Sequence, residues 1–150
     1  MITEENVGVL IICSDRRLQE RPNGHNYTAQ FIREVAGCEC YGYERPGGVL
    51  KLICNERKEA KREYLKELEL FVKHGANIFF LVAHGGRCAA YNEKFKLFSQ
   101  HEETETQHAD LLEAARIIKG EFPNVDVRIF YADLIGEDSK KFIFREISQK

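Results

Sequence analysis

Two short stretches of the sequence each join an apolar run to residues that can bind a metal or move a proton. The pattern Cys-x-Asp-x-Arg at 13–17 follows the apolar run 7–12, and a histidine and a cysteine at 84–88 follow the run 78–83. Apolar runs rich in Val, Ile and Phe predict strands buried on both faces, as in a parallel sheet. Because ligands bind beyond the carboxyl ends of such strands, we expect the two stretches to face each other across one site.

Cys13, His84 and Cys88 together form a soft nitrogen and sulfur donor set, and zinc is its usual occupant. Three protein ligands leave a fourth position for water or a carboxylate. Zinc lowers the pKa of a bound water to about 7, which provides a hydroxide nucleophile at neutral pH. The donor set therefore predicts a Zn²⁺ site with hydrolytic or hydration chemistry.

Asp15 and Arg17 extend the first motif. Asp15 is close enough to Cys13 to reach the fourth position, and Arg17 can pair with Asp15 and draw it away from the metal. A carboxylate released in this way can accept a hydrogen bond from the zinc-bound hydroxide and orient it. The alternative interpretation is an ion pair that only closes the end of the strand.

The remaining pattern alternates strands with helices, which predicts an α/β fold: a single domain over 1–150 with a mainly parallel β-sheet flanked by helices. A further helix carries Tyr91, Phe95 and Phe98, which we expect in the core, and residues 100–106 read as a polar break. The other predicted helices are 27–36, 49–75 and 107–120, and the predicted strands are 6–13, 39–44, 77–83 and 125–131. The segment 142–147 fits an edge strand or a short helix, and the edge strand is favoured.

Composition excludes several classes of protein. The chain is 43% hydrophobic and 31% charged, as in a folded globular domain. A net charge of −2 gives no electrostatic footprint for nucleic acid, and no run approaches the roughly 20 apolar residues of a membrane span. The acidic N-terminus lacks the pattern of a signal peptide, so we expect a cytoplasmic protein.

The odd count of five cysteines argues against a disulfide framework, and Cys38, Cys40 and Cys54 are interpreted as small packed side chains.

The motifs resemble those of the β-class carbonic anhydrases. That family has Cys-x-Asp-x-Arg after its first strand, which residues 13–17 match in full, and His-x-x-Cys after a later strand. Between them the family commonly has an Arg-x-Ala-Gly turn, and the segment 45–48, Arg-Pro-Gly-Gly, is similar to it. The resemblance covers about 6–131 and points to a short, divergent carbonic anhydrase-like branch.

This resemblance implies a zinc lyase that hydrates CO2 reversibly to bicarbonate and a proton, or acts on a related linear molecule such as COS or CS2. Zn²⁺ would be held by Cys13, His84 and Cys88, while Asp15 would alternate between zinc and hydroxide under the control of Arg17. The N–H groups of Gly47 and Gly48 would form a turn or favour an anion such as bicarbonate. The family also implies a homodimer or a higher homo-oligomer.

The sequence departs from the family in two ways. The spacing His84-x-x-x-Cys88 is one residue longer, which places Gly85 at the usual ligand position. His84 can still reach the metal through the flexible Gly85-Gly86 pair, and either His101 or His108 is an alternative ligand. The long N-terminal helical arm that helps to build the family's dimer is also absent, so the dimer can differ or be lost.

Two other functions stay open on the sequence alone. The fold can persist as a non-catalytic zinc-binding protein or a metal-free binding protein, because the altered spacing can close the fourth position. A thiol enzyme is the third hypothesis, with Cys13 as nucleophile and its pKa lowered by Arg16 and Arg17.

Overall fold

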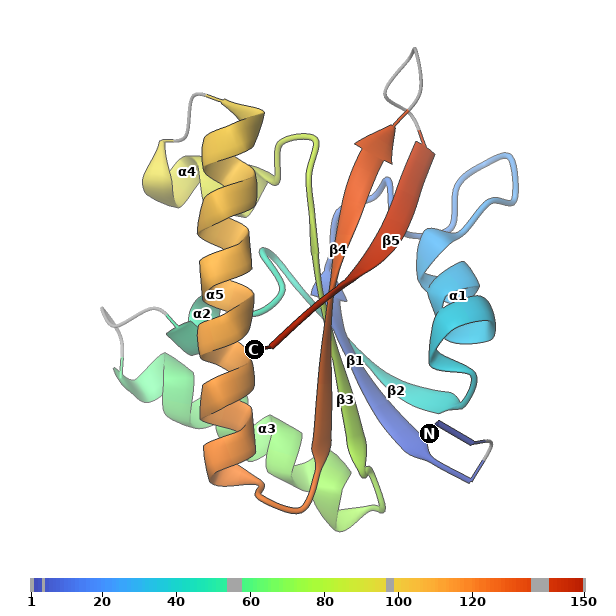
Figure 1. The fold of residues 1–150 in the computed structure, drawn as a ribbon, viewed down its shortest axis with the longest axis vertical. Helices are drawn as coiled ribbons and strands as arrows, with labels where there is room; N and C mark the ends of the chain where they lie inside the picture. Colours follow the sequence, from blue (N-terminus) through green and yellow to red (C-terminus); the bar gives the residue numbers. More distant parts are fainter. Residues whose placement is uncertain (1, 4, 54–57, 97–98, 136–140, 150) are drawn as a thin grey trace.

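The computed structural model describes residues 2–3, 5–53, 58–96, 99–135 and 141–149. Within these residues, five strands form one sheet in the order β2-β1-β3-β4-β5 (Figure 1). The first four run parallel, and β5 pairs antiparallel with β4 at the edge, which confirms the predicted mainly parallel sheet and its edge strand. The strands are β1 (Val7–Cys13), β2 (Glu39–Arg45), β3 (Ile78–His84), β4 (Asp126–Ile135) and β5 (Lys141–Ile147).

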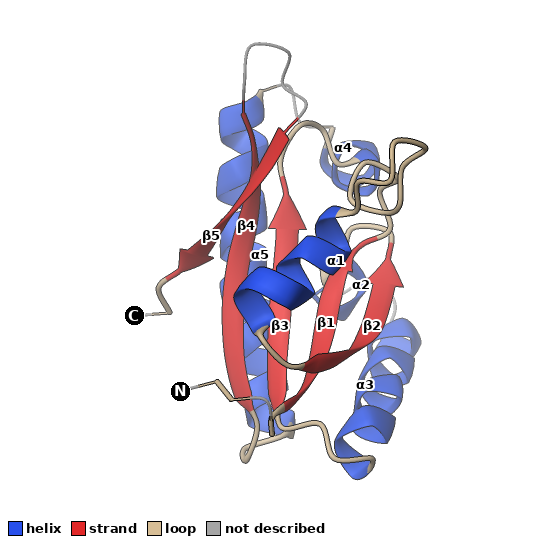
Figure 2. Cartoon of the chain, turned by 90° about the vertical axis from the view of Figure 1, so that its right-hand side faces the viewer, coloured by secondary structure: helices blue, strands red, loops and turns tan. Residues whose placement is uncertain are grey.

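Helices cover both faces of this sheet. Figures 1 and 2 show α1 on one face and α3 and α5 on the other. The helical elements are α1 (Tyr27–Phe31), the π-helix η1 (Ile32–Ala36), α2 (Leu50–Ile53), α3 (Lys58–Lys73), α4 (Ala89–Phe95) and α5 (Gln100–Glu121). None of the described helices is long and apolar enough to cross a membrane.

The central strand β1 shows why the apolar runs are continuous. Val9 and Ile11 pack into the core shared with α3 and α5, while Leu10 and Ile12 pack into the core shared with α1. All four side chains are fully buried. Burial of each such side chain stabilises the fold by about 1.5–3 kcal/mol, so neither face of β1 tolerates polar residues.

The predicted polar break at 100–106 is wrong, because these residues form the first two turns of α5. The Ser99 side chain accepts a hydrogen bond from the Glu102 N–H at 3.0 Å and begins the helix. Glu103 and Gln107 lie on the buried face of α5, so its inward stripe is partly polar. A helix whose buried positions are polar carries no apolar period in the sequence.

Other boundaries differ by a few residues. Strand β4 runs to residue 135, four residues beyond the predicted end. The predicted helix 49–75 contains α2 and α3, and Cys54 lies outside the described residues, as does Phe98.

The predicted core position of Phe95 is wrong: its side chain is 39% exposed, whereas Tyr91 is buried. Phe95 stacks on Tyr91 near the end of the short helix α4 and faces solvent there.

Candidate metal centre

The carboxyl ends of β1 and β3 bring three side chains together. Cys13 is the last residue of β1, His84 is the last residue of β3, and Cys88 directly precedes α4. The strands pair side by side, with Ile12 opposite Val82. One ligand atom from each of the three side chains lies within 4.8 Å of the others, and all three residues are buried. The geometry thus places the predicted donor set at one point.

The His84 ring is oriented to offer one nitrogen. Its Nδ1 lies 2.8 Å from the carbonyl oxygen of Gly85, so Nδ1–H donates to that oxygen, and in the neutral ring Nε2 carries the lone pair. Nε2 is buried and has no hydrogen-bond partner. An unsatisfied buried nitrogen costs about 1–3 kcal/mol, and coordination of a metal ion would use that lone pair.

The two thiols fit the same ion. Sγ of Cys13 and Sγ of Cys88 are 3.8 Å apart. Two thiolates at about 2.3 Å from a tetrahedral zinc ion are separated by about 3.8 Å. The residues present therefore fit a zinc ion both in donor chemistry and in spacing.

The electrostatics of the cluster favour a thiolate at Cys13. A hydrogen bond from Cys88 lowers the pKa of Cys13 to about 4 against the effect of burial, and His84 and the Gly47 N–H act in the same direction. The shared hydrogen bond and burial raise the pKa of Cys88. Burial lowers the pKa of His84, but the neighbouring Cys13 sulfur outweighs it, and the net shift is upward. Arg16 and Arg17, which the thiol-enzyme hypothesis invoked, are not among the main causes of the shift in the pKa of Cys13.

Asp15 lies beside the cluster and is held by Arg17. The Arg17 backbone N–H and Nε donate to Oδ1 of Asp15 at 2.8 and 3.1 Å, and Nη2 donates to Oδ2 at 2.8 Å. Burial raises the pKa of Asp15, but these hydrogen bonds outweigh it and lower the pKa below its ordinary value. Oδ2 lies 3.7 Å from Nε2 of His84. The carboxylate is thus next to the donor set while engaged by the guanidinium.

The longer loop between His84 and Cys88 is accommodated by two left-handed residues. Gly86 has φ +71° and Arg87 has φ +65°. This conformation is natural for glycine but costs an L-residue such as Arg87 roughly 1–2 kcal/mol. The turn shortens the loop and lets both His84 and Cys88 reach the cluster despite the extra residue.

A buried carboxylate that the sequence did not single out holds this loop. Glu103 of α5 is 2% exposed and accepts hydrogen bonds from the N–H groups of Arg87 and Cys88. It fell within the stretch interpreted as a polar break. The sequence signal for this helix is Ser99, a residue type that favours the position before the first helical residue. A helix that begins after Ser99 places Glu103, Gln107 and Leu111, each four residues apart, on one face.

The turn at Gly47 and Gly48 serves the fold and the thiol. Both residues are buried and left-handed, with φ of +75° and +61°. The Gly47 N–H donates to Sγ of Cys13 at 3.3 Å, and the Gly48 N–H donates to the carbonyl oxygen of Arg45. Both N–H groups have partners within the protein, which favours the turn interpretation of Gly47 and Gly48 over the anion-binding alternative.

Strand β5 supplies an aromatic wall that the sequence reasoning also missed. The Phe142 ring is buried, lies 6.0 Å from the His84 ring and packs edge-on against Tyr27. The guanidinium of Arg17 lies 5.8 Å from the centre of the same ring. Phe142 therefore contacts both the donor set and the residue that holds Asp15.

The other histidines lie elsewhere. The side chain of His101 is 80% exposed on α5, and His108 packs its ring against Tyr131. His25 is exposed in the loop before α1. Within the described residues, the group that could hold a metal includes His84 and no other histidine.

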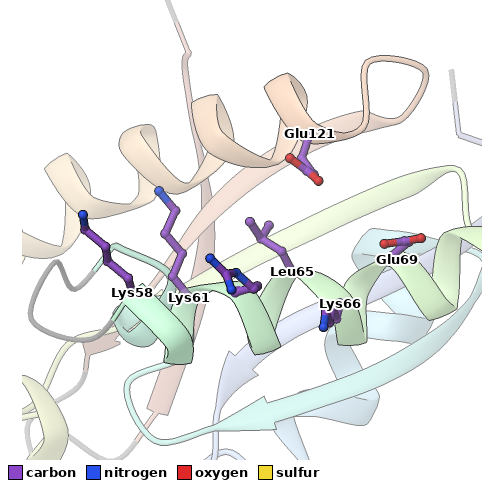
Figure 3. A pocket seen from close by; sticks show the side chains of 7 residues that line it. Lys58, Lys61, Leu65, Lys66, Glu69 and Glu121 are labelled. Atoms are coloured by element: carbon purple, nitrogen blue, oxygen red, sulfur yellow. The ribbon is translucent and has the colours of Figure 1, made fainter.

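One hollow of the described structure lies away from this site. It measures about 610 Å³ and lies between α3 and α5, where Lys58 and Lys61 of α3 extend toward α5 and Glu121 of α5 lines the hollow (Figure 3). None of the residues predicted for the site lines it. Its lining residues are Lys58, Lys61, Arg62, Leu65, Lys66, Glu69 and Glu121.

Comparison with known proteins gives a match in structure only. No protein-family model matches the chain, and no curated protein matches it in sequence. The β-carbonic anhydrase CafA of the fungal pathogen Aspergillus fumigatus superposes with a TM-score of 0.61 at 11% identity, over 98% of this chain and 77% of CafA. The fold is that of the β-carbonic anhydrases.

Two further carbonic anhydrase structures are similar at lower scores. The carbonic anhydrase of Glaciozyma antarctica matches with a TM-score of 0.47 at 12% identity, over 94% of this chain and 82% of its own. The β-carbonic anhydrase CcaA matches with a TM-score of 0.43 at 14% identity, over 96% and 80%. At such identities the likeness concerns the β-carbonic anhydrase fold, and the donor set rests on the geometry of this chain alone.

Proposed function

We propose that this protein is a zinc-dependent carbonic anhydrase that hydrates CO2 reversibly to bicarbonate and a proton. The observation that carries the proposal is the buried, unpartnered Nε2 of His84 facing two thiols that lie 3.8 Å apart. This group lies at the strand ends of a β-carbonic anhydrase fold, beside an Asp–Arg pair.

Cys13, His84 and Cys88 would hold the zinc ion. When bound, zinc supplies Lewis acidity that brings the pKa of a coordinated water to about 7. The Gly47 N–H supports the Cys13 thiolate, and the Gly85 carbonyl fixes the tautomer of His84. These two contacts orient the ligands before any metal binds.

Asp15 would accept a hydrogen bond from the attacking water or hydroxide and orient it for attack. Its Oδ1 accepts two hydrogen bonds from Arg17, whereas Oδ2 accepts one and lies nearest to His84. Oδ2 therefore retains an acceptor lone pair on the side of the donor set. Arg17 keeps the Asp15 carboxylate ionised and prevents it from taking the fourth ligand position.

Phe142 and Tyr27 would form the apolar side of the substrate site. Their rings contact each other at 5.3 Å, and Phe142 also contacts His84. An aromatic wall excludes water and suits a small uncharged molecule such as CO2 or COS, which needs no charged partner before it reacts.

The first test is the metal content of protein purified without chelator or added metal. About one zinc per chain, followed by CO2 hydration in a stopped-flow assay with a pH indicator, is the expected result. The Asp15→Ala variant serves as the matched control for turnover. One zinc per chain without turnover would favour a non-catalytic zinc-binding protein, and failure to take up zinc on titration would overturn the proposal.

A further inference from the structure

Glu103 is a buried carboxylate whose hydrogen-bond partners are all N–H donors. Its Oε1 accepts from the Arg87 N–H at 3.0 Å and from Nε2 of Gln100 at 3.3 Å. Its Oε2 accepts from the Cys88 N–H at 2.8 Å and from Nδ2 of Asn92 at 2.7 Å. Among the described residues no lysine or arginine lies within ion-pair distance of Glu103, so four neutral donors compensate for its burial.

Two of these donors belong to consecutive residues of the loop 85–88, which connects His84 to α4. The N–H groups of Arg87 and Cys88 both point at Glu103, so the carboxylate fixes the backbone of the loop where it enters α4. The position of the Cys88 backbone determines where its Sγ can lie relative to Cys13. Arg87 also holds a left-handed conformation, which a loop without this anchor would relax.

The backbone of Arg87, which Glu103 holds, also contacts Arg17 of the Asp15–Arg17 pair. The carbonyl oxygen of Arg87 accepts a hydrogen bond from Nη2 of Arg17 at 3.3 Å, and Nη2 also donates to Asp15. Displacement of Arg87 would therefore move the guanidinium that holds Asp15. Glu103 is connected through Arg87 and Arg17 to Asp15, and directly to Cys88.

We infer that Glu103 is a positioning residue of the metal centre, which sets Cys88 for coordination and, through Arg87 and Arg17, the place of Asp15. The inference rests on the proposed zinc function. Only a group that accepts at both ends satisfies the four donors. Glutamine has the same shape but presents an NH2 group to two of them, and aspartate keeps the charge but is one methylene shorter.

The test compares the wild type with Glu103→Gln, Glu103→Asp and the control Glu105→Gln. Glu105 lies on the same helix, but its side chain is 71% exposed and contacts only His101 among the pairs described. Zinc affinity is measured by competition with a chromophoric chelator. The absorption spectrum of the cobalt(II)-loaded protein reports the ligand geometry separately from activity.

We expect both Glu103 variants to bind zinc roughly 10–100-fold more weakly than the wild type, with a changed cobalt spectrum. Glu105→Gln should match the wild type in both measurements. If Glu103→Gln does not fold, Glu103→Asp carries the test. A folded variant with wild-type affinity and spectrum overturns the inference, even if its unfolding temperature is lower. A wild type without a thiolate-to-cobalt band overturns the metal site itself, and the role of Glu103 with it.

Discussion

Arg17 binds both carboxylate oxygens of Asp15 and holds Oδ2 of that carboxylate 3.7 Å from Nε2 of His84. This distance is too long for a hydrogen bond but short enough for both atoms to face one small ligand. Asp15 is therefore neither part of the donor set nor remote from it. Its position suits a group that acts on a water molecule held between them.

Replacement of Asp15 by alanine should separate metal binding from turnover. Asp15→Ala leaves Cys13, His84 and Cys88 unchanged, so we expect about one zinc per chain to remain. The loss of the acceptor that orients the attacking hydroxide should lower the rate of CO2 hydration by roughly 10²-fold or more. Stopped-flow kinetics and elemental analysis on the same sample measure both quantities, and unchanged turnover would remove Asp15 from the mechanism.

The sequence predicted the parts of the site that local chemistry determines. The apolar runs that became β1 and β3 end at Cys13 and His84, because a strand buried on both faces stops where reactive side chains begin. Adjacent parallel strands bring such ends to the same edge, so the grouping of Cys13, His84 and Cys88 followed from spacing and topology.

The parts that depend on distant segments could not be read in this way. Glu103 is a polar residue in a polar stretch, so the sequence does not distinguish it from its neighbours. Its role depends on the hydrogen bonds that it accepts from the N–H groups of residues 87 and 88, which only the fold brings close. Phe142 reaches His84 only because β5 turns back along β4. Hydrophobic periodicity predicts neither the contact of Glu103 nor that of Phe142, because both contacts are formed by tertiary packing.

The two cysteines of the candidate site should differ from the buried Cys38 in their effect on zinc. Cys13→Ser replaces a thiolate by a hydroxyl that binds zinc poorly, so we expect most of the bound zinc to be lost. Cys38→Ser is the matched control, because Cys38 is also buried and free but lies outside the donor group. Elemental analysis after gel filtration gives the answer, and full zinc occupancy in Cys13→Ser would refute the ligand assignment.

Phe142 should contribute to stability as well as to the site. Its ring is 2% exposed and packs against Tyr27 and His84, so Phe142→Ala should destabilise the fold by about 3–5 kcal/mol. Phe95→Ala is the comparison, because Phe95 is 39% exposed and its ring contacts Tyr91 and the Lys94 ammonium at the surface; its cost should be about 1 kcal/mol. Denaturant unfolding measures both, and equal costs would show that β5 packs loosely over the site.

Asp110 of α5 should make stability depend on pH. Burial raises the pKa of Asp110 to about 6, although Tyr91 and Lys94 act in the opposite direction, and Oδ2 has no hydrogen-bond partner. Between about pH 4 and pH 6 the folded protein keeps a proton that the unfolded chain releases. The free energy of unfolding should therefore fall as pH rises through this interval and remain lower above it.

The variant Asp110→Asn removes this titration and so should be more stable than the wild type above pH 6. The full shift corresponds to about 3 kcal/mol, and solvent screening of this half-buried carboxylate reduces the expected gain to about 1 kcal/mol. Near pH 4 the two proteins should be equally stable, because Asp110 is then protonated in both states. Denaturant unfolding from pH 4 to pH 8, with the exposed Asp126→Asn as control, measures the difference. A gain that is constant across this range would show that the amide acts through packing and not through the charge of Asp110.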